Sequence, residues 1–312
     1  MVALTLVVYF FARANPGAVI RAFSQLAAAP LLIVVALVLV DRALMAYRWF
    51  VLLRPLEAQR LPPFGVILET FFVSTFLGTF LPGSIGGDAV RAYSLSTHGV
   101  PIGDSMASVF ADRMLGILSL LLMALVSVSL ARDLASDRAV LAGLAAAMTA
   151  CLVAGMLVFS EKTESAFEGL LGRVSRQSIR RVPAQFLSSI RRYAHHREAL
   201  MLVLCASIAV QVLRIIQAYY LGAALGLVQP LTIYFAFVPL ILLVMLLPVT
   251  VNGIGTSQAA FVWLFARTGT PAHEAFALSV LFVALQIVGN IPGAVFVILR
   301  TFSSARPWQP RQ

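Results

Sequence analysis

The chain has 312 residues, of which 60% are hydrophobic and 12% charged, and its mean hydropathy is +0.93. A soluble domain is about half apolar and about one quarter charged, so this composition excludes a water-soluble enzyme. Lys and Arg outnumber Asp and Glu by 23 to 13, but the basic residues flank apolar runs. This distribution indicates membrane orientation and contact with anionic lipid rather than nucleic-acid binding.

Apolar runs that resemble membrane helices follow one another along the chain. The first run, 2–12, is too short to cross a hydrocarbon layer of about 30 Å, and we expect a first helix that begins before residue 1. The other runs predict helices at 27–53, 64–82, 106–131, 139–159, 199–226, 231–249, 254–266 and 272–299. The sequence therefore predicts an all-α, polytopic integral membrane protein with a single transmembrane domain, 1–312.

Basic residues predict which loops are cytoplasmic. The loop 160–198 is the most basic stretch, and it is expected to be cytoplasmic, as are residues 54–63 and the C-terminus. With these assignments, the run 64–82 starts and ends on the cytoplasmic side, and the segment 231–266 starts and ends on the outer side. Both are therefore predicted to be re-entrant helical segments.

Within the loop 160–198, apolar residues follow Pro183 at helical spacing. They are Phe186, Leu187, Ile190 and Tyr193. This stripe favours a short helix that lies on the inner leaflet and is held by anionic lipid. The alternative is a plain loop whose charge only orients the protein.

The two re-entrant segments resemble each other in sequence. Residues 80–87 match 246–255 with a two-residue insertion, and 98–105 parallel 268–275. The predicted helix breaks are Pro82 and Gly83 in the first segment, and Pro248, Gly253 and Gly255 in the second. We interpret the pattern as an inverted repeat, with repeat one at about 27–159 and repeat two at about 199–300, an architecture typical of transporters. The alternative is that a Leu-Pro pair followed by glycines recurs by chance.

Ionisable side chains inside a membrane cost a few kcal/mol each and mark candidate functional sites. The candidates here are Asp41, Arg42, Arg48, Glu69, Asp88, Arg91, Asp112, Arg113 and Arg214. Five arginines against four carboxylates leave one positive charge in excess, which favours an anionic ligand. Because the arginine fork binds phosphate with two hydrogen bonds, the pattern favours a phosphate-bearing headgroup. Arg42 is expected to extend to the membrane interface and is left out of the predicted site.

Glycines add to this predicted anion site. Gly83, Gly86 and Gly87 are expected to expose backbone N–H groups at the start of a helix that begins near Asp88. The alternative is that these charges have a structural role. In that interpretation, Asp88 pairs with Arg91 and Asp112 pairs with Arg113, and the pairs fix the positions of the helices.

Other polar residues of the apolar runs have structural interpretations. Gln258 is expected to satisfy backbone groups freed by the second break, and Gln286 and Asn290 are expected to bond between helices. The sequence has no nucleophile-and-base pattern, no P-loop and no zinc spacing, so no catalysis, metal or cofactor is expected.

Several motifs together carry a resemblance to a known family. They are LPGSIGGDAVR at 81–91, ASVFADR at 107–113 followed by Gly116, Arg48-Trp49, the segment 247–255 and IPG at 291–293. This combination resembles the lysylphosphatidylglycerol synthase transmembrane-region family, also called the flippase-like domain. The resemblance implies a bacterial inner (plasma) membrane protein whose relatives move aminoacylated phosphatidylglycerol between leaflets or are tied to polyprenyl lipids. The soluble aminoacyl-transferase domain of the name-giving members is not found in these 312 residues.

The leading hypothesis is a translocase that moves an anionic or phosphate-bearing lipid between leaflets. Its headgroup path is expected to use Arg48, Arg91, Arg113 and Arg214, with Asp41, Asp88 and Asp112 holding these arginines. One alternative is a polyprenyl-phosphate-dependent transferase with Asp88, Asp104 or Asp112 on Mg²⁺. Another is a non-transporting scaffold. Expected partners are anionic phospholipid or polyprenyl-phosphate-linked lipid, with a further copy of the chain or a separate lipid-modifying enzyme as additional candidates.

Overall fold

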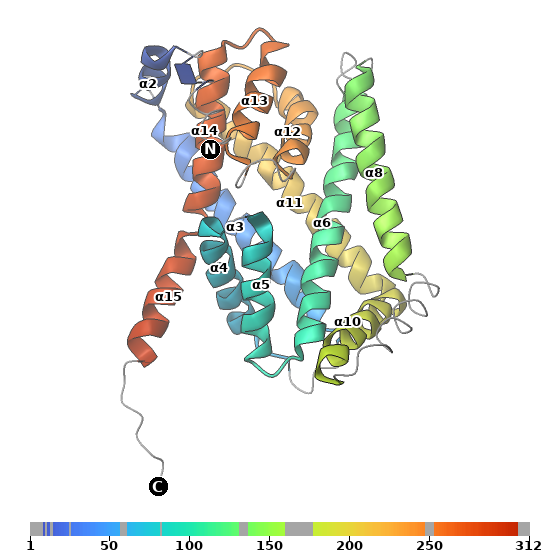
Figure 1. The fold of residues 1–312 in the computed structure, drawn as a ribbon. Coiled ribbons are helices and arrows are strands. Elements are labelled where there is room, and N and C mark those ends of the chain that lie inside the picture. The colour runs from blue at the N-terminus through green and yellow to red at the C-terminus, as the bar shows by residue number, and fades with distance from the viewer. Residues whose placement is uncertain are drawn as a thin grey trace.

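The computed structural model describes residues 9, 11–12, 15–24, 26–56, 61–81, 83–130, 137–159, 177–246 and 253–304. Within these residues every regular element is a helix (Figure 1), which confirms the all-α fold class. Predictions for residues 1–8, for Pro82, for 160–176 and for Pro248 lie outside the described residues.

Most helices coincide with predicted apolar runs, but no run predicts the helices Pro16–Ser24 and Gly83–Ser96. The helices are α2 (Pro16–Ser24), α3 (Ala28–Leu53), α4 (Phe64–Phe80), α5 (Gly83–Ser96), α6 (Ile102–Leu130), α8 (Arg138–Phe159), α10 (Gln177–His195), α11 (Arg197–Ala224), α12 (Leu231–Leu246), α13 (Thr256–Ala266), α14 (Ala272–Val288) and α15 (Ile291–Ser304). Among the described segments, four are long and apolar enough to cross a membrane: Ala28–Leu53, Ile102–Leu130, Arg197–Ala224 and Ala272–Leu299. The last of them includes both α14 and most of α15.

Proline and glycine set the helix boundaries at two matching places. Gly99, in the turn after α5, has φ +88°, and Gly269, in the turn after α13, has φ +75°, a left-handed conformation that favours glycine. Pro101 then precedes α6, and Pro271 precedes α14, where a proline removes no helical hydrogen bond. The two sequence motifs therefore have the same local geometry.

Two helical hairpins lie in opposite halves of the molecule (Figure 1). Helices α4 and α5 pack antiparallel, and the outer ends of this hairpin lie at the α10 end. Helices α12 and α13 pack together with their outer ends at the opposite end. In the second hairpin, Gly253 and Gly255 have φ values of +72° and +95° just before α13, which agrees with the predicted break. The equivalence of the two halves, 27–159 and 199–300, stays a prediction.

The first hairpin depends on close contact between glycines. Helix α5 begins at Gly83, so the predicted start near Asp88 is wrong, and Gly86 and Gly87 lie inside the helix. A Cβ atom added at Gly78 of α4 would come within 3.0 Å of the Gly87 Cα. Gly87 is therefore needed for close packing of two backbones, and the predicted anion site on helix-terminal N–H groups does not form at Gly86 and Gly87.

Helix α10 also differs from the prediction. It includes Pro183 and begins before it. Its apolar face contacts the protein, since Ile190 and Tyr193 are buried and the Tyr193 hydroxyl donates to the Leu52 carbonyl at 2.7 Å. Burial raises the pKa of the Tyr193 hydroxyl, which keeps it a donor. The prediction that this stripe lies on lipid is wrong because the ends of α3 and α6 offer it an apolar surface.

The last apolar run forms two helices instead of the single helix predicted. Helix α14 ends at Val288, and α15 begins at Ile291. At this break the Asn290 side chain donates to Thr79 Oγ1 of α4 at 2.9 Å. This contact confirms the predicted interhelical role of Asn290 and joins the tip of the first hairpin to the break.

The predicted role of Gln258 is also confirmed. Its side-chain oxygen accepts a hydrogen bond from the Gly255 backbone N–H at 2.6 Å, at the start of α13. An amide side chain thus satisfies a donor that the helix itself leaves free.

We expect Gly293→Ala to destabilise the protein strongly. A Cβ atom at Gly293 would overlap the Phe72 backbone carbonyl, because α15 packs directly on α4. The matched control is Gly143→Ala on α8, where a Cβ atom meets nothing within 4 Å. Thermal unfolding in detergent should show a lowered Tm for Gly293→Ala and an unchanged or raised Tm for the control. Equal Tm values for the two variants would contradict this packing.

Candidate functional site

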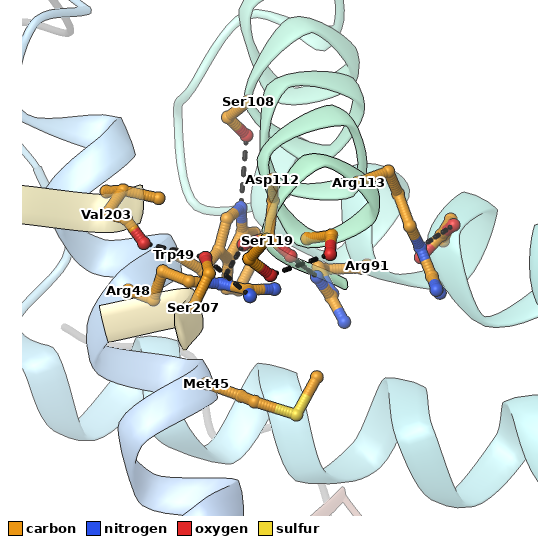
Figure 2. A network of polar contacts seen from close by, with 12 residues as sticks. Met45, Arg48, Trp49, Arg91, Ser108, Asp112, Arg113, Ser119, Val203 and Ser207 are labelled. Carbon is orange, nitrogen blue, oxygen red and sulfur yellow. Dashed lines mark hydrogen bonds and ion pairs between the residues drawn. The ribbon is translucent and has the colours of Figure 1, made fainter. Parts of the chain in front are cut away.

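Buried charges in the centre of the helix bundle form a triad of two arginines on one carboxylate. Asp112 of α6 accepts a hydrogen bond from Arg48 Nε of α3 at 2.7 Å and another from Arg91 Nη1 of α5 at 3.3 Å. The three side chains are at most 5% exposed. Figure 2 shows Asp112 between the two guanidinium groups. We call Arg48, Asp112 and Arg91 the first triad.

The two arginines of the first triad are held differently. Arg48 Nη1 also donates to Ser207 Oγ of α11 at 2.9 Å, so its guanidinium is anchored on two sides. Arg91 donates one hydrogen bond within the described residues, and its buried Nε has no acceptor among them. Its guanidinium lies 5.1 Å and 4.7 Å from the ring centroids of Trp49 and Phe71. Because aromatic faces attract a cation without using its N–H groups, Arg91 retains donors for a further acceptor.

Another ion pair lies beside the first triad. Arg113 Nε and Nη2 donate to the two carboxylate oxygens of Asp88 at 2.7 and 2.8 Å, a bidentate contact. The Arg113 side chain is 42% exposed, although it lies about 16 Å along the apolar helix α6 from its start. Arg91 is within electrostatic range of both residues. The Asp88–Arg113 pair is therefore the accessible edge of a site whose buried part is the first triad.

The pairing of these charges differs from the structural interpretation of the sequence. That interpretation pairs Asp88 with Arg91 and Asp112 with Arg113, whereas the structure exchanges the partners. The physical reason is that α5 and α6 pack against each other. Each carboxylate therefore contacts an arginine on the neighbouring helix instead of the one nearby in its own sequence.

Asp41 of α3 is shared between two arginines in a similar way. It lies 3.1 Å from Arg42 Nη1 and 3.4 Å from Arg214 Nε of α11. Arg42 Nη2 also donates to the side-chain oxygen of Gln286 on α14 at 2.8 Å, which confirms the predicted interhelical role of Gln286. Both arginines donate to the Met45 sulfur, at 3.6 and 3.3 Å. We call Asp41, Arg42 and Arg214 the second triad.

Arg42 belongs to the second triad, although it was left out of the predicted site. Its side chain is 7% exposed and bonds to α14, so the prediction that it extends to the membrane interface is wrong. Asp41 and Arg48 lie on the same helix but belong to different triads. The usable signal was Asp41 itself, since a carboxylate in the middle of an apolar helix requires a nearby cation.

Both groups of charges carry a positive excess. The first triad with the Asp88–Arg113 pair contains three arginines and two aspartates, and the second triad contains two arginines and one aspartate. An uncompensated charge in an apolar interior is costly, so each group favours an anion with one negative charge. A phosphate diester has that charge, and its oxygens match the arginine fork.

The carboxylates proposed for a magnesium-dependent transferase are bonded to arginines. Asp88, Asp104 and Asp112 each accept a hydrogen bond from at least one arginine. In the part of the chain that the structure describes, no group of three His, Cys, Asp or Glu side chains could hold a metal ion. The arrangement of these three residues therefore gives no support to the transferase alternative.

A surface cavity of about 550 Å³ lies away from the triads, between the end of α3 and the junction of α10 and α11. Arg54, His195 and Arg197 contribute to its wall, and all three are exposed. The triads instead lie within apolar helices, where charges need a functional or structural reason. We therefore place the candidate site at the triads.

Long apolar helices with paired charges in their interior define an integral, multi-pass membrane protein. The family model described as the lysylphosphatidylglycerol synthase TM region matches residues 1–293, and the chain belongs to this family. The resemblance seen in the sequence is thereby confirmed. No curated protein matches the chain.

We expect Asp112→Asn to destabilise the fold by about 3–5 kcal/mol, because it leaves two buried arginines without their shared carboxylate. The matched control is Asp137→Asn, which removes a partly exposed ion pair with Arg267 and should cost less than about 1 kcal/mol. Thermal or denaturant unfolding in detergent measures both. Equal losses in the two variants would contradict the burial of two arginines on Asp112.

Proposed function

We propose that this protein moves an anionic, phosphate-bearing lipid between the two leaflets of its membrane. The observation that carries the proposal is the combination of the partly exposed Asp88–Arg113 pair with the buried, incompletely bonded Arg91 beside it. A headgroup phosphate that exchanges with Asp88 on Arg113 would then meet the free donors of Arg91. The positive excess of the cluster would compensate its charge.

The arrangement of the hairpins supports a path from one side to the other. In our proposal the α4–α5 hairpin enters the membrane from the α10 side, and the α12–α13 hairpin enters from the opposite side. Family membership supports a role in membrane lipid biology. Exposure of the triads to one side and then to the other would move the headgroup while the acyl chains stay in the bilayer.

Orientation and location are part of the same proposal. The basic loop 160–198 and the C-terminus are proposed to be cytoplasmic, in a bacterial inner membrane. We propose no catalytic role, since the acidic residues of the site serve to hold arginines. The partners would be anionic phospholipids or polyprenyl-phosphate-linked lipids, together with a further copy of the chain or a separate enzyme that modifies the lipid.

We expect Arg91→Gln to reduce the rate of lipid translocation about tenfold while leaving the protein folded. Asp112 keeps its hydrogen bond to Arg48 in this variant, so no carboxylate is left unpaired. The measurement is the translocation of fluorescent phosphatidylglycerol and of a fluorescent polyprenyl phosphate in proteoliposomes. A fluorescent phosphatidylcholine, whose headgroup has no net charge, tests the dependence on charge.

The control is Arg138→Gln at the start of α8, which removes the same charge from an exposed position. It should translocate both anionic lipids at the wild-type rate. Wild-type rates no faster than those of protein-free liposomes, for every lipid tried, would overturn the proposed function. An Arg91→Gln rate equal to the wild-type rate would remove Arg91 from the path.

A further inference from the structure

The second triad has the same construction as the first. In each, one aspartate is shared between an arginine of α3 and an arginine of a different helix. The α3 arginine is firmly bonded in both cases, Arg48 to Ser207 Oγ at 2.9 Å and Arg42 to Gln286 Oε1 at 2.8 Å. The arginine from the other helix is held loosely in both, as the contacts of Arg91 and Arg214 demonstrate.

Arg214 makes few contacts for a guanidinium that is largely buried. Its side chain is 19% exposed, and its Nε lies 3.4 Å from Asp41 Oδ1 without forming a hydrogen bond. Its Nη2 donates to the Met45 sulfur at 3.3 Å, a weak acceptor. An arginine with five N–H donors in this environment has unused capacity for an oxygen-rich anion.

Buried polar atoms without partners surround this position. The side-chain nitrogen of Gln286 and the Nε of Arg42 are buried and lack acceptors within the described residues. On α11, one turn beyond Arg214, Gln217 is fully buried, and both of its amide atoms lack partners there. Asp41 Oδ1 and the Gln217 side-chain oxygen are unpaired acceptors within the described residues, and the other unpaired atoms here, the larger number, are donors. Buried polar groups are normally hydrogen-bonded, so this group of unpaired atoms next to a surplus cation indicates a binding site.

The spacing of the triads follows from the packing of two helices. Helices α3 and α11 lie side by side and antiparallel, and the Ala27 N–H at the start of α3 donates to the Ala224 carbonyl at the end of α11 at 3.1 Å. Seven residues separate Asp41 from Arg48 on α3, which corresponds to about 10 Å along the helix. The two triads therefore lie in succession along one helix pair.

We propose that Arg214, together with the Asp41–Arg42 pair, forms a second binding station for the phosphate of the transported lipid. The inference rests on the proposed function for the identity of the lipid. The first triad with Arg113 receives the headgroup at one level of the protein, and the second triad holds it at the next level about 10 Å further along α3. Loose bonding of Arg91 and Arg214 lets each guanidinium turn from its aspartate to the phosphate.

The test is a titration of the purified full-length protein in detergent with dihexanoyl phosphatidylglycerol, a soluble short-chain lipid, by calorimetry. The wild type should bind two molecules, whereas Arg214→Gln and Arg91→Gln should each retain one site and bind at the other at least about tenfold more weakly. Arg214→Gln leaves Asp41 paired with Arg42, so it should fold. Arg138→Gln is the control, because it removes the same charge, and it should bind two lipid molecules.

A second variant keeps the test informative if Arg214→Gln misfolds. Arg214→Lys keeps the charge but loses the fork, and it should bind at the second station with an affinity between those of the wild type and Arg214→Gln. Two sites of wild-type affinity in Arg214→Gln would overturn the second station. If the wild type has a single site, and only Arg91→Gln removes it, the second station is also overturned.

Inorganic phosphate in the same titration separates the two sources of the anion. Weaker binding of inorganic phosphate than of the short-chain lipid supports a lipid headgroup, and equal affinity contradicts it. Failure of the second station is distinguishable from failure of the proposed function. A wild type that translocates lipid but binds only at the first triad would overturn the station alone, whereas absence of translocation would overturn the function.

Discussion

The structure depends on the sharing of one buried carboxylate between arginines of different helices. Asp112 joins α6 to α3 through Arg48 and to α5 through Arg91, in an interior from which water is largely excluded. A buried ion pair contributes little net stability compared with apolar residues of similar size, but breaking it is costly. Such an arrangement therefore fixes the helices relative to one another more than it stabilises the fold.

The sharing of aspartates explains how the protein folds with a net positive charge in its interior. Asp112 and Asp41 each neutralise one arginine and leave the charge of another uncompensated, and the surplus arginine is the one with the fewest hydrogen bonds. For Arg91 the rings of Trp49 and Phe71 supply part of the missing stabilisation. The surplus charge is thus tolerated without a ligand and is available to an anion.

Helix positions and the charged residues could be predicted from the sequence, because apolar runs and isolated charges are local signals. The start of α3, the length of α4 and the role of Gln258 at a helix break all follow from residues near in sequence. The ion pairs could not be predicted, because they depend on which helices pack against each other. The sequence predicts Arg42 at the membrane interface, but in the structure Arg42 bonds to Gln286 of α14. The sequence predicts an anion site at Gly87, but in the structure Gly87 packs against Gly78 of α4.

The central claim is that a lipid phosphate enters the protein interior at the arginines. The most direct measurement is an experimental structure of the chain in a bilayer of phosphatidylglycerol, with attention to density near Arg91 and Arg113. Our account predicts headgroup density within hydrogen-bond distance of these two guanidinium groups, with the acyl chains extending between helices into the bilayer. Lipid phosphates found only at the two membrane surfaces, with Arg91 and Arg113 facing bulk solvent, would contradict it.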